Sequence, residues 1–161
     1  MKRWELCMLK SYKDKDGSWH IGYGHGNASG VPPFVDETTT LKDEKEAEDI
    51  LFADLEYLLS IVKKQIKSEV ILNDNQFSAI MDVAYNRGPG TLRESAVMYW
   101  INNPEDGLHL KKAARAFVFH EDGFKTLDTA FDPKTQETRV YLGLQLRRID
   151  DASLFQTPIK D

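Results

Sequence analysis

Cysteine and long apolar runs are almost absent from this chain of 161 residues. Cys7 is the only cysteine, so no intrachain disulfide and no cysteine-rich zinc site can form. No window approaches the roughly 18 consecutive apolar residues of a membrane-spanning helix. The apolar stretch after Lys2 and Arg3 is short and is interrupted by Glu5, which excludes a signal-peptide core. The sequence therefore predicts a protein made in the cytoplasm, with no membrane span and no signal peptide.

An excess of positive charge is also lacking. The chain has 21 Lys and Arg against 26 Asp and Glu, a formal net charge of -5. This balance argues against a nucleic-acid partner, because phosphate neutralisation needs a basic face. With 41% hydrophobic and 29% charged residues and no visible repeat, the composition is that of a globular protein. The length suits a single domain, which we expect to be monomeric and built as one body or as two lobes.

Helical spacing dominates the chain after residue 43. Asp43 and Glu46 resemble a capping box, and the apolar residues that follow predict one long amphipathic helix over residues 43–67. A second helix is expected from Asn73 or Asp74 to Gly88, where glycine followed by proline is a natural stop. Further helices are predicted at Met1 to Lys10, Arg93 to Asn102, Glu105 to Phe119 and Glu137 to Leu154. The segment from Asp122 to Gln136 is expected to be irregular.

The segment of residues 11–40 has a different pattern. Trp19, Ile21 and Tyr23 alternate after a turn at residues 14–17, which predicts a β-hairpin or small meander. The chain is therefore predicted to be α+β. Its expected parts are a small β-rich lobe at about 11–40, a connecting helix at about 43–67, and an all-helical lobe at about 68–161 on which a short helix of residues 1–10 packs.

Glu5, Asp14 and His20 fall within sixteen residues and are the candidate catalytic residues. Glycoside cleavage commonly uses one carboxylic acid to protonate the leaving oxygen and a second group to stabilise the cation or deliver the nucleophile. Glu5 follows Trp4 on an apolar segment and suits the acid, while Asp14 in a polar turn suits the second role. His20 could orient or deprotonate a water, or act as a nucleophile.

Other interpretations of these residues stay open. Acidic residues near helix starts and in turns usually face solvent or cap the backbone, and a strand histidine is more often structural. A metal site from Asp14, His20 and His25 is conceivable, but it matches no recognised ligand spacing. We therefore expect no metal.

The order of these residues resembles that of the phage-type lysozyme family. Eight residues separate Glu5 from Asp14, five separate Asp14 from position 20, and residues 21–25 read Ile-Gly-Tyr-Gly-His. Other matching segments are Tyr12 to Asp14, Gly17, Ala47 to Leu55, Gln76 to Gly88, Ser95 and Gly143 to Arg148. The resemblance covers most of the chain and is weakest at residues 26–40 and 120–138.

The resemblance implies a muramidase. Such an enzyme hydrolyses the β-1,4 bond between N-acetylmuramic acid and N-acetylglucosamine in peptidoglycan glycan strands, without a metal or organic cofactor. By position, Glu5 would be the general acid and Asp14 the second carboxylate. The other positions carried over are Tyr85, Asn86 and Ser95 in the sugar groove, His25 and Asp54 as a structural ion pair, and Arg147 facing Glu5. For Ser95, helix packing and capping are an equally good explanation.

His20 is the main departure, because the family usually has a threonine there that holds the attacking water. An imidazole is a stronger base and nucleophile than a hydroxyl, so we hypothesise a retaining reaction with some transglycosylation. A wall-binding structural module without activity and a lytic transglycosylase are the alternatives, although the presence of both Glu5 and Asp14 favours hydrolysis.

The setting of the protein is a further expectation. Only four residues precede Glu5, and the segment of residues 122–136 looks longer than its family equivalent. The first feature suggests a domain of a longer protein, such as a virion component with other virion proteins as partners, and the second could reshape the groove or contact a partner. The enzyme would act on the bacterial cell wall in the periplasm, either after release at lysis or as part of the virion.

Overall fold

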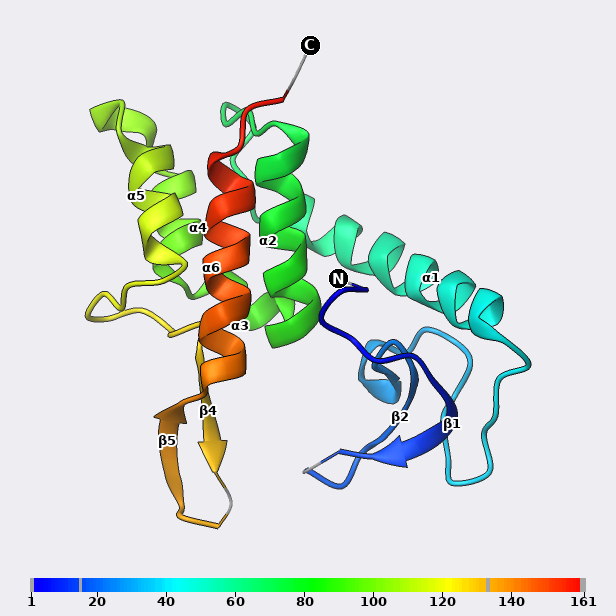
Figure 1. Ribbon diagram of the computed structural model, residues 1–161. Helices are drawn as coiled ribbons and strands as arrows, with labels where there is room; N and C mark the ends of the chain where they lie inside the picture. Colours follow the sequence, from blue (N-terminus) through cyan, green and yellow to red (C-terminus); the bar gives the residue numbers. More distant parts are fainter. Residues whose placement is uncertain (1, 15, 133, 160–161) are drawn as a thin grey trace. The chain divides into compact units, whose positions relative to one another are not determined.

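The computed structural model describes residues 2–14, 16–132 and 134–159. The chain forms two compact units, residues 1–60 and residues 61–161, and each is described by itself. Figure 1 shows that the first unit holds a small sheet and most of a long helix, while the second is mainly helical. The predicted α+β class is confirmed. No helix in the described part of the chain is long and apolar enough to cross a membrane.

The sheet of the first unit is a three-stranded antiparallel meander. Its strands are β1 (Met8–Lys13), β2 (Trp19–Gly22) and β3 (His25–Gly26), in the order β1-β2-β3. The expected turn joins β1 to β2: the Gly17 amide donates to the Asp14 carbonyl at 2.9 Å, and Gly17 has a φ of 88° that favours glycine. Tyr12 pairs with His20, and His20 in turn pairs with Gly26.

The predicted helix at residues 1–10 is wrong. Residues 2–4 form a turn, and strand β1 begins at Met8. Beyond its pairing with β2, the backbone of this segment is held by the Leu41 amide, which donates to the Leu9 carbonyl at 2.8 Å. An isolated helix of this length is marginal in water, so sheet pairing decides the conformation.

The long helix is α1 (Glu44–Lys63), close to the predicted range. The Asp43 carboxylate caps it by accepting from the Glu46 amide at 3.0 Å, as the capping signal indicated. The Glu46 carboxylate accepts from the Lys42 amide at 2.7 Å, so only half of the expected box forms. Ile21 of β2 is completely buried and Ala47 of α1 almost completely, and both belong to the core of this unit.

The helices of the second unit are shorter and more numerous than predicted. They are α2 (Asp74–Arg87), α3 (Pro89–Arg93), α4 (Ala96–Ile101), α5 (His109–Ala116) and α6 (Leu142–Gln156), with a 3₁₀ turn η2 at Pro104–Asp106. Asn73 caps α2 with a complete capping box, as expected. The predicted helix at residues 93–102 is split because Ser95 starts α4 as its N-cap.

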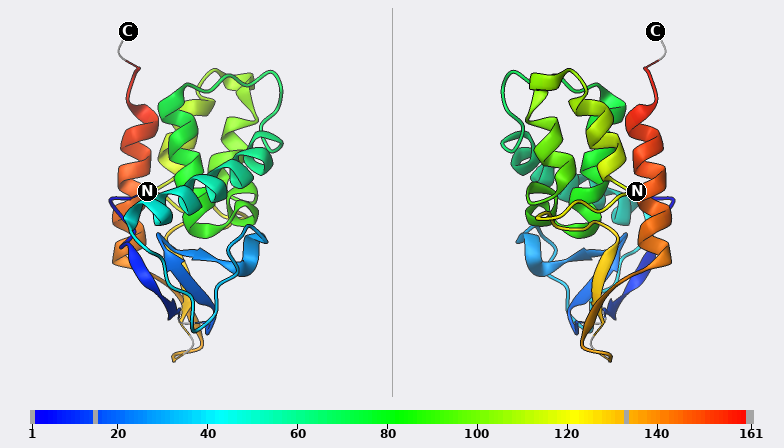
Figure 2. Two further views of the ribbon diagram at one scale, coloured as in Figure 1. Left: turned by 90° about the vertical axis from the view of Figure 1, so that its right-hand side faces the viewer. Right: turned by 90° about the vertical axis from the view of Figure 1, so that its left-hand side faces the viewer.

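The expectation of an all-helical second lobe is also wrong. Strands β4 (Thr129–Asp132) and β5 (Glu137–Val140) form an antiparallel hairpin next to the start of α6, which Figure 2 shows in yellow and orange. The final helix therefore begins at Leu142 instead of Glu137. Residues 137–140 contain two β-branched residues, and their pairing with residues 129–132 overrides the helical pattern.

Candidate active site

Glu5 and His20 meet at Gly24 within the first unit. An ideal Cβ placed on Gly24 would lie 3.8 Å from Oε2 of Glu5, so the half-buried Glu5 carboxylate lies against this glycine. The Gly24 carbonyl is 3.1 Å from Nδ1 of His20. Gly24 has a φ of 93°, a conformation that other residues rarely adopt. The Gly22–Tyr23–Gly24 segment thus brings a carboxylate and an imidazole to one point.

Tyr12 connects the same point with Asp14. Its ring lies beside the His20 ring with centroids 5.9 Å apart. Burial raises the pKa of the Tyr12 hydroxyl, and the negative charges of Glu5 and Asp14 raise it further. Both carboxylates are therefore close enough to Tyr12 to act on it electrostatically. Asp14 is exposed and follows directly after the end of β1.

The imidazole of His20 is held on several sides. Because a carbonyl oxygen only accepts, Nδ1 must carry the proton that it shares with the Gly24 carbonyl. This leaves Nε2 facing the Ser18 hydroxyl at 2.8 Å. Below the ring, a Cβ on Gly26 would come within 2.8 Å of two ring atoms of His20. Only glycine at position 26 leaves room for this ring position.

A hydrogen-bonded chain runs from His20 through Ser18 to Asp16. Oδ1 of Asp16 accepts from the Ser18 hydroxyl at 2.5 Å and from the Ser18 amide at 2.9 Å. These bonds from Ser18 lower the pKa of Asp16, and the charge of His20 adds to the effect. The hydroxyl has one hydrogen: it can donate to Nε2 of a neutral His20, or to Asp16 while a protonated His20 donates to Ser18. The chain is therefore able to exchange a proton.

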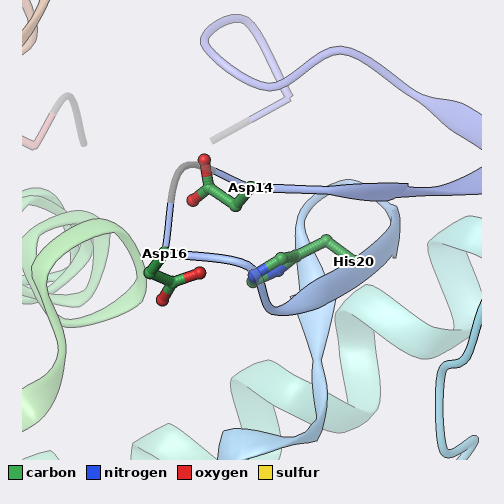
Figure 3. A group of neighbouring side chains, drawn as sticks. All are labelled: Asp14, Asp16 and His20. Carbon is green, nitrogen blue, oxygen red and sulfur yellow. The ribbon is translucent and has the colours of Figure 1, made fainter.

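Among the described residues, the group that could hold a metal ion differs from the one considered in the sequence. The ligand atoms of Asp14, Asp16 and His20 lie within 4.8 Å of one another (Figure 3). His25 is not part of this group, and its ring nitrogens contact the Asp54 carboxylate and the Pro33 carbonyl. Asp16 and His20 are joined through the Ser18 hydroxyl, so we assign this pair to proton transfer.

His25 and Asp54 form a buried pair that joins β3 to α1. Nδ1 of His25 is 2.9 Å from the Asp54 carboxylate, and Nε2 is 2.8 Å from the Pro33 carbonyl. Both ring nitrogens face acceptors, so the arrangement suits the imidazolium form. Burial lowers the pKa of His25, but the bonds to Asp54 and Pro33 outweigh burial and raise it above its usual value. The geometry is that of a structural ion pair.

Arg147 is buried in the second unit, where its guanidinium donates to both oxygens of Asp82 at 2.7 and 3.1 Å. Burial raises the pKa of Asp82, but the hydrogen bonding and charge of Arg147 outweigh it and leave the pKa below its usual value. Arg148 is completely buried, and its Nε lies 3.0 Å from Asp151. Glu5 belongs to the other unit, so the expected facing of Arg147 and Glu5 stays a prediction.

The three residues predicted to line a sugar groove have different surroundings. Ser95 is 1% exposed, donates to the Leu92 carbonyl at 2.7 Å and accepts from the Met98 amide at 3.3 Å. Helix capping accounts for these two bonds, and a sugar contact of Ser95 stays a prediction. Tyr85 and Asn86 are half-buried at the end of α2, and Asn86 accepts from Arg148 at 3.2 Å.

Comparison with known proteins assigns the chain to a family. The family model described as phage lysozyme matches residues 2–131. The chain belongs to the phage lysozyme family.

Relatives of this phage lysozyme family member include two curated endolysins. The endolysin of Bacillus phage PZA is 30% identical over 98% of this chain and 52% of its own length. That of Salmonella phage P22 is 29% identical over 88% of this chain and 92% of its own. The chain thus spans about half the length of the Bacillus phage relative.

Solved structures agree with the fold. The muramidase domain of SpmX from Asticaccaulis excentricus has a TM-score of 0.76 and 27% identity, and the match covers 98% of this chain and 92% of that one. A lysozyme mutant of P22 has a TM-score of 0.68 and 24% identity, with 97% and 92% covered.

Sequence reasoning missed several residues around His20 in this phage lysozyme family member. Asp16 and Ser18 precede His20 at alternate positions, a spacing that places side chains on one face of an extended segment and that would have pointed to them. Tyr12 and Gly26 left no such signal. They meet His20 only through the strand register.

Proposed function

We propose that this chain is a muramidase that hydrolyses the β-1,4 bond between N-acetylmuramic acid and N-acetylglucosamine in bacterial peptidoglycan. The observation that carries the proposal is the convergence of Glu5 and His20 on Gly24. Asp14 and Glu5 both raise the pKa of their shared neighbour Tyr12. A half-buried acid and an exposed carboxylate in one small region suit the two roles of glycoside cleavage.

Glu5 is the general acid in this proposal. Its carboxyl group protonates the glycosidic oxygen as the bond to the anomeric carbon breaks, and the other sugar develops the charge of an oxocarbenium ion. Asp14 is exposed and stabilises that positive charge. The reaction needs no metal or organic cofactor. Tyr85 and Asn86 contact the glycan by stacking and hydrogen bonding.

His20 directs the second half of the reaction. Its Nε2 is the reactive nitrogen once the Ser18 hydroxyl has turned away from it, because Nδ1 donates to the Gly24 carbonyl. We propose that His20 makes the enzyme retaining: Nε2 occupies the place where a water would otherwise attack, and stabilises or bonds to the anomeric carbon. Water, or a second sugar hydroxyl, then releases the product, which gives hydrolysis with some transglycosylation.

Zymography on purified bacterial cell wall tests whether Glu5 is the general acid. Glu5→Gln should abolish clearing, since an amide cannot donate the proton, whereas Glu37→Gln, a control at an exposed position of the same unit, should clear like the parent. Equal clearing by Glu5→Gln and the parent would remove Glu5 from catalysis.

The stereochemistry needs a separate measurement. NMR of the anomer first released from a defined muropeptide oligomer should show the retained form. Release of the inverted anomer alone would exclude the retaining course. Mass spectrometry of the same products should show reducing muramic ends, since anhydromuramic ends would indicate a lytic transglycosylase instead.

The acidic net charge of -5 supports delivery as part of a virion. Long-range attraction to an anionic wall is unfavourable for a negatively charged enzyme, and a virion component does not depend on it. The partners in this proposal are peptidoglycan glycan strands and other virion proteins, and the protein is monomeric. Mass spectrometry of purified particles should detect the chain, and its absence would favour release at lysis.

A further inference from the structure

The second unit contains an open pocket of about 750 Å³ that none of the proposed catalytic residues touches. Its wall is formed by the turn after α1, by α3 and α4, and by the loop of residues 123–125. We call this the unit 2 pocket. Its volume falls in the range of small-molecule binding sites.

The walls of the unit 2 pocket are cross-linked by hydrogen bonds. Asn102 donates through its side-chain amide to the Gln65 carbonyl and accepts from the Lys67 amide, both at 2.8 Å. The Lys125 amide donates to the Glu94 carbonyl at 2.9 Å. These bonds tie the three wall segments together, so the pocket is formed before a ligand arrives.

Positive charge gathers at the unit 2 pocket, against the trend of the whole chain. Lys64, Arg93 and Lys125 line it and are exposed. Of the described residues, Glu94 is the only acidic one in the lining, and it is paired with Arg93 at 3.1 Å. The chain as a whole carries a net charge of -5. A local excess of cations in an acidic protein indicates an anionic ligand.

The pocket also offers an aromatic surface and an unpaired acceptor. Tyr99 is 45% exposed, and its ring centroid lies 5.1 Å from that of Phe124. Gln65 donates through Nε2 to the Pro89 carbonyl at 3.0 Å, which fixes the orientation of its amide. Its Oε1 is buried and has no hydrogen-bond partner in the described ranges 2–14, 16–132 and 134–159. A donor that reaches Oε1 from the pocket would satisfy it.

We propose that the unit 2 pocket binds an uncleaved muramyl-peptide portion of peptidoglycan. Carboxylates of the lactyl-linked peptide suit Lys64 and Lys125, an acetamido N–H suits the Gln65 oxygen, and the apolar face of a pyranose ring suits Tyr99. The proposed function supplies only the choice of ligand. Such a site gives an acidic enzyme a local attachment to an anionic wall that its overall charge does not provide.

The test uses the full chain with Glu5→Gln, so that the ligand stays intact, and amide NMR during titration with a soluble disaccharide-peptide. Amide signals of Tyr99, Asn102 and Lys125 should shift. In the double variant Lys64→Glu and Lys125→Glu, the dissociation constant read from these signals should rise by about tenfold or more. Gln65→Met removes the acceptor and should also weaken binding.

A matched double variant controls for net charge. Lys111→Glu and Lys134→Glu changes exposed lysines of the same unit outside the pocket, and binding should be unaffected. Shifts confined to residues 2–60, or equal weakening in both double variants, would overturn the proposal. Equal binding of a neutral chitotriose would overturn the role of the cations.

Different results would refute the pocket proposal and the proposed catalytic function. Pocket shifts together with full wall clearing by Glu5→Gln would overturn the catalytic proposal and support the pocket. Loss of wall clearing in Glu5→Gln without shifts of the pocket signals would support the catalytic proposal and overturn the pocket.

Discussion

Asp151 gives the sharpest test of how the interior of the second unit holds charge. Its carboxyl group is 3% exposed and lies beside Arg148. Burial raises the pKa of Asp151 from 3.8 to about 8, and the charge of Asp82 and a hydrogen bond with it act in the same direction. Arg148 acts against the rise but does not cancel it, so Asp151 is protonated in the folded protein at neutral pH.

The sign of the effect on stability follows from proton binding. Between pH 3.8 and about 8 the folded protein holds a proton at Asp151 that the unfolded chain has released. The free energy of unfolding therefore falls as pH rises, with a slope of up to about 1.4 kcal/mol per pH unit. Asp151→Asn supplies a neutral side chain of the same shape that can still donate to Asp82. At pH 7 it should be more stable than the parent by up to about 4 kcal/mol.

Urea unfolding between pH 4 and pH 8 measures this difference. Trp100 is the single tryptophan of residues 61–161, so in a Trp4→Phe and Trp19→Phe background its fluorescence reports on the second unit. The two proteins should be equally stable near pH 4 and diverge as pH rises. The control Asp122→Asn, at an exposed position, should follow the parent. If Asp151→Asn is instead less stable than the parent at pH 7, Asp151 is ionised and its ion pair with Arg148 is favourable.

Other predictions concern single contacts. Gly26→Ala should displace the His20 ring and lower kcat without a large change in stability, since the backbone at Gly26 is extended with a φ of -146°; unchanged kinetics would contradict a role for His20. Asp54→Asn should cost about 3 kcal/mol in urea unfolding, because it removes one partner of a buried pair. The stabilisation from His25, whose pKa is raised, is fully present below about pH 6.5 and is lost as pH rises through its folded value, and Asp54→Asn should weaken this dependence. Ser95→Ala should cost about 1 kcal/mol in thermal unfolding through the lost cap of α4, and a larger loss of activity than of stability would support the predicted sugar contact. EDTA should leave wall clearing unchanged, and inhibition would indicate a required metal.

The helix starts show which parts of the fold could be predicted. Asp43 and Asn73 cap helices where the sequence indicated, because capping depends on residues three or four positions apart. Residues 2–10 and 137–140 were expected to be helical, but residues 2–4 form a turn and residues 8–10 and 137–140 are strand. Their hydrogen bonds go to residues that are distant in the sequence, and local periodicity carries no information about such partners.

In the candidate site, too, some features could be predicted from the sequence and others depend on the fold. Glu5, Asp14 and His20 are recognisable in the sequence because they are few and closely spaced. The chain from Asp16 through Ser18, and the contact with Gly26, depend on the turn after β1 and on the pairing of β2 with β3.

The sequence by itself determined the α+β class, the long helix, the capped start of α2 and the likeness to the phage lysozymes, because these rest on local patterns and spacing. Only the tertiary structure decided that β1 replaces a helix, that β4 and β5 interrupt the helical unit, and that Ser95 serves as a cap. It also decided how His20 is held. The physical reason is that strand pairing and burial join groups far apart in the chain, and their energies outweigh local preference.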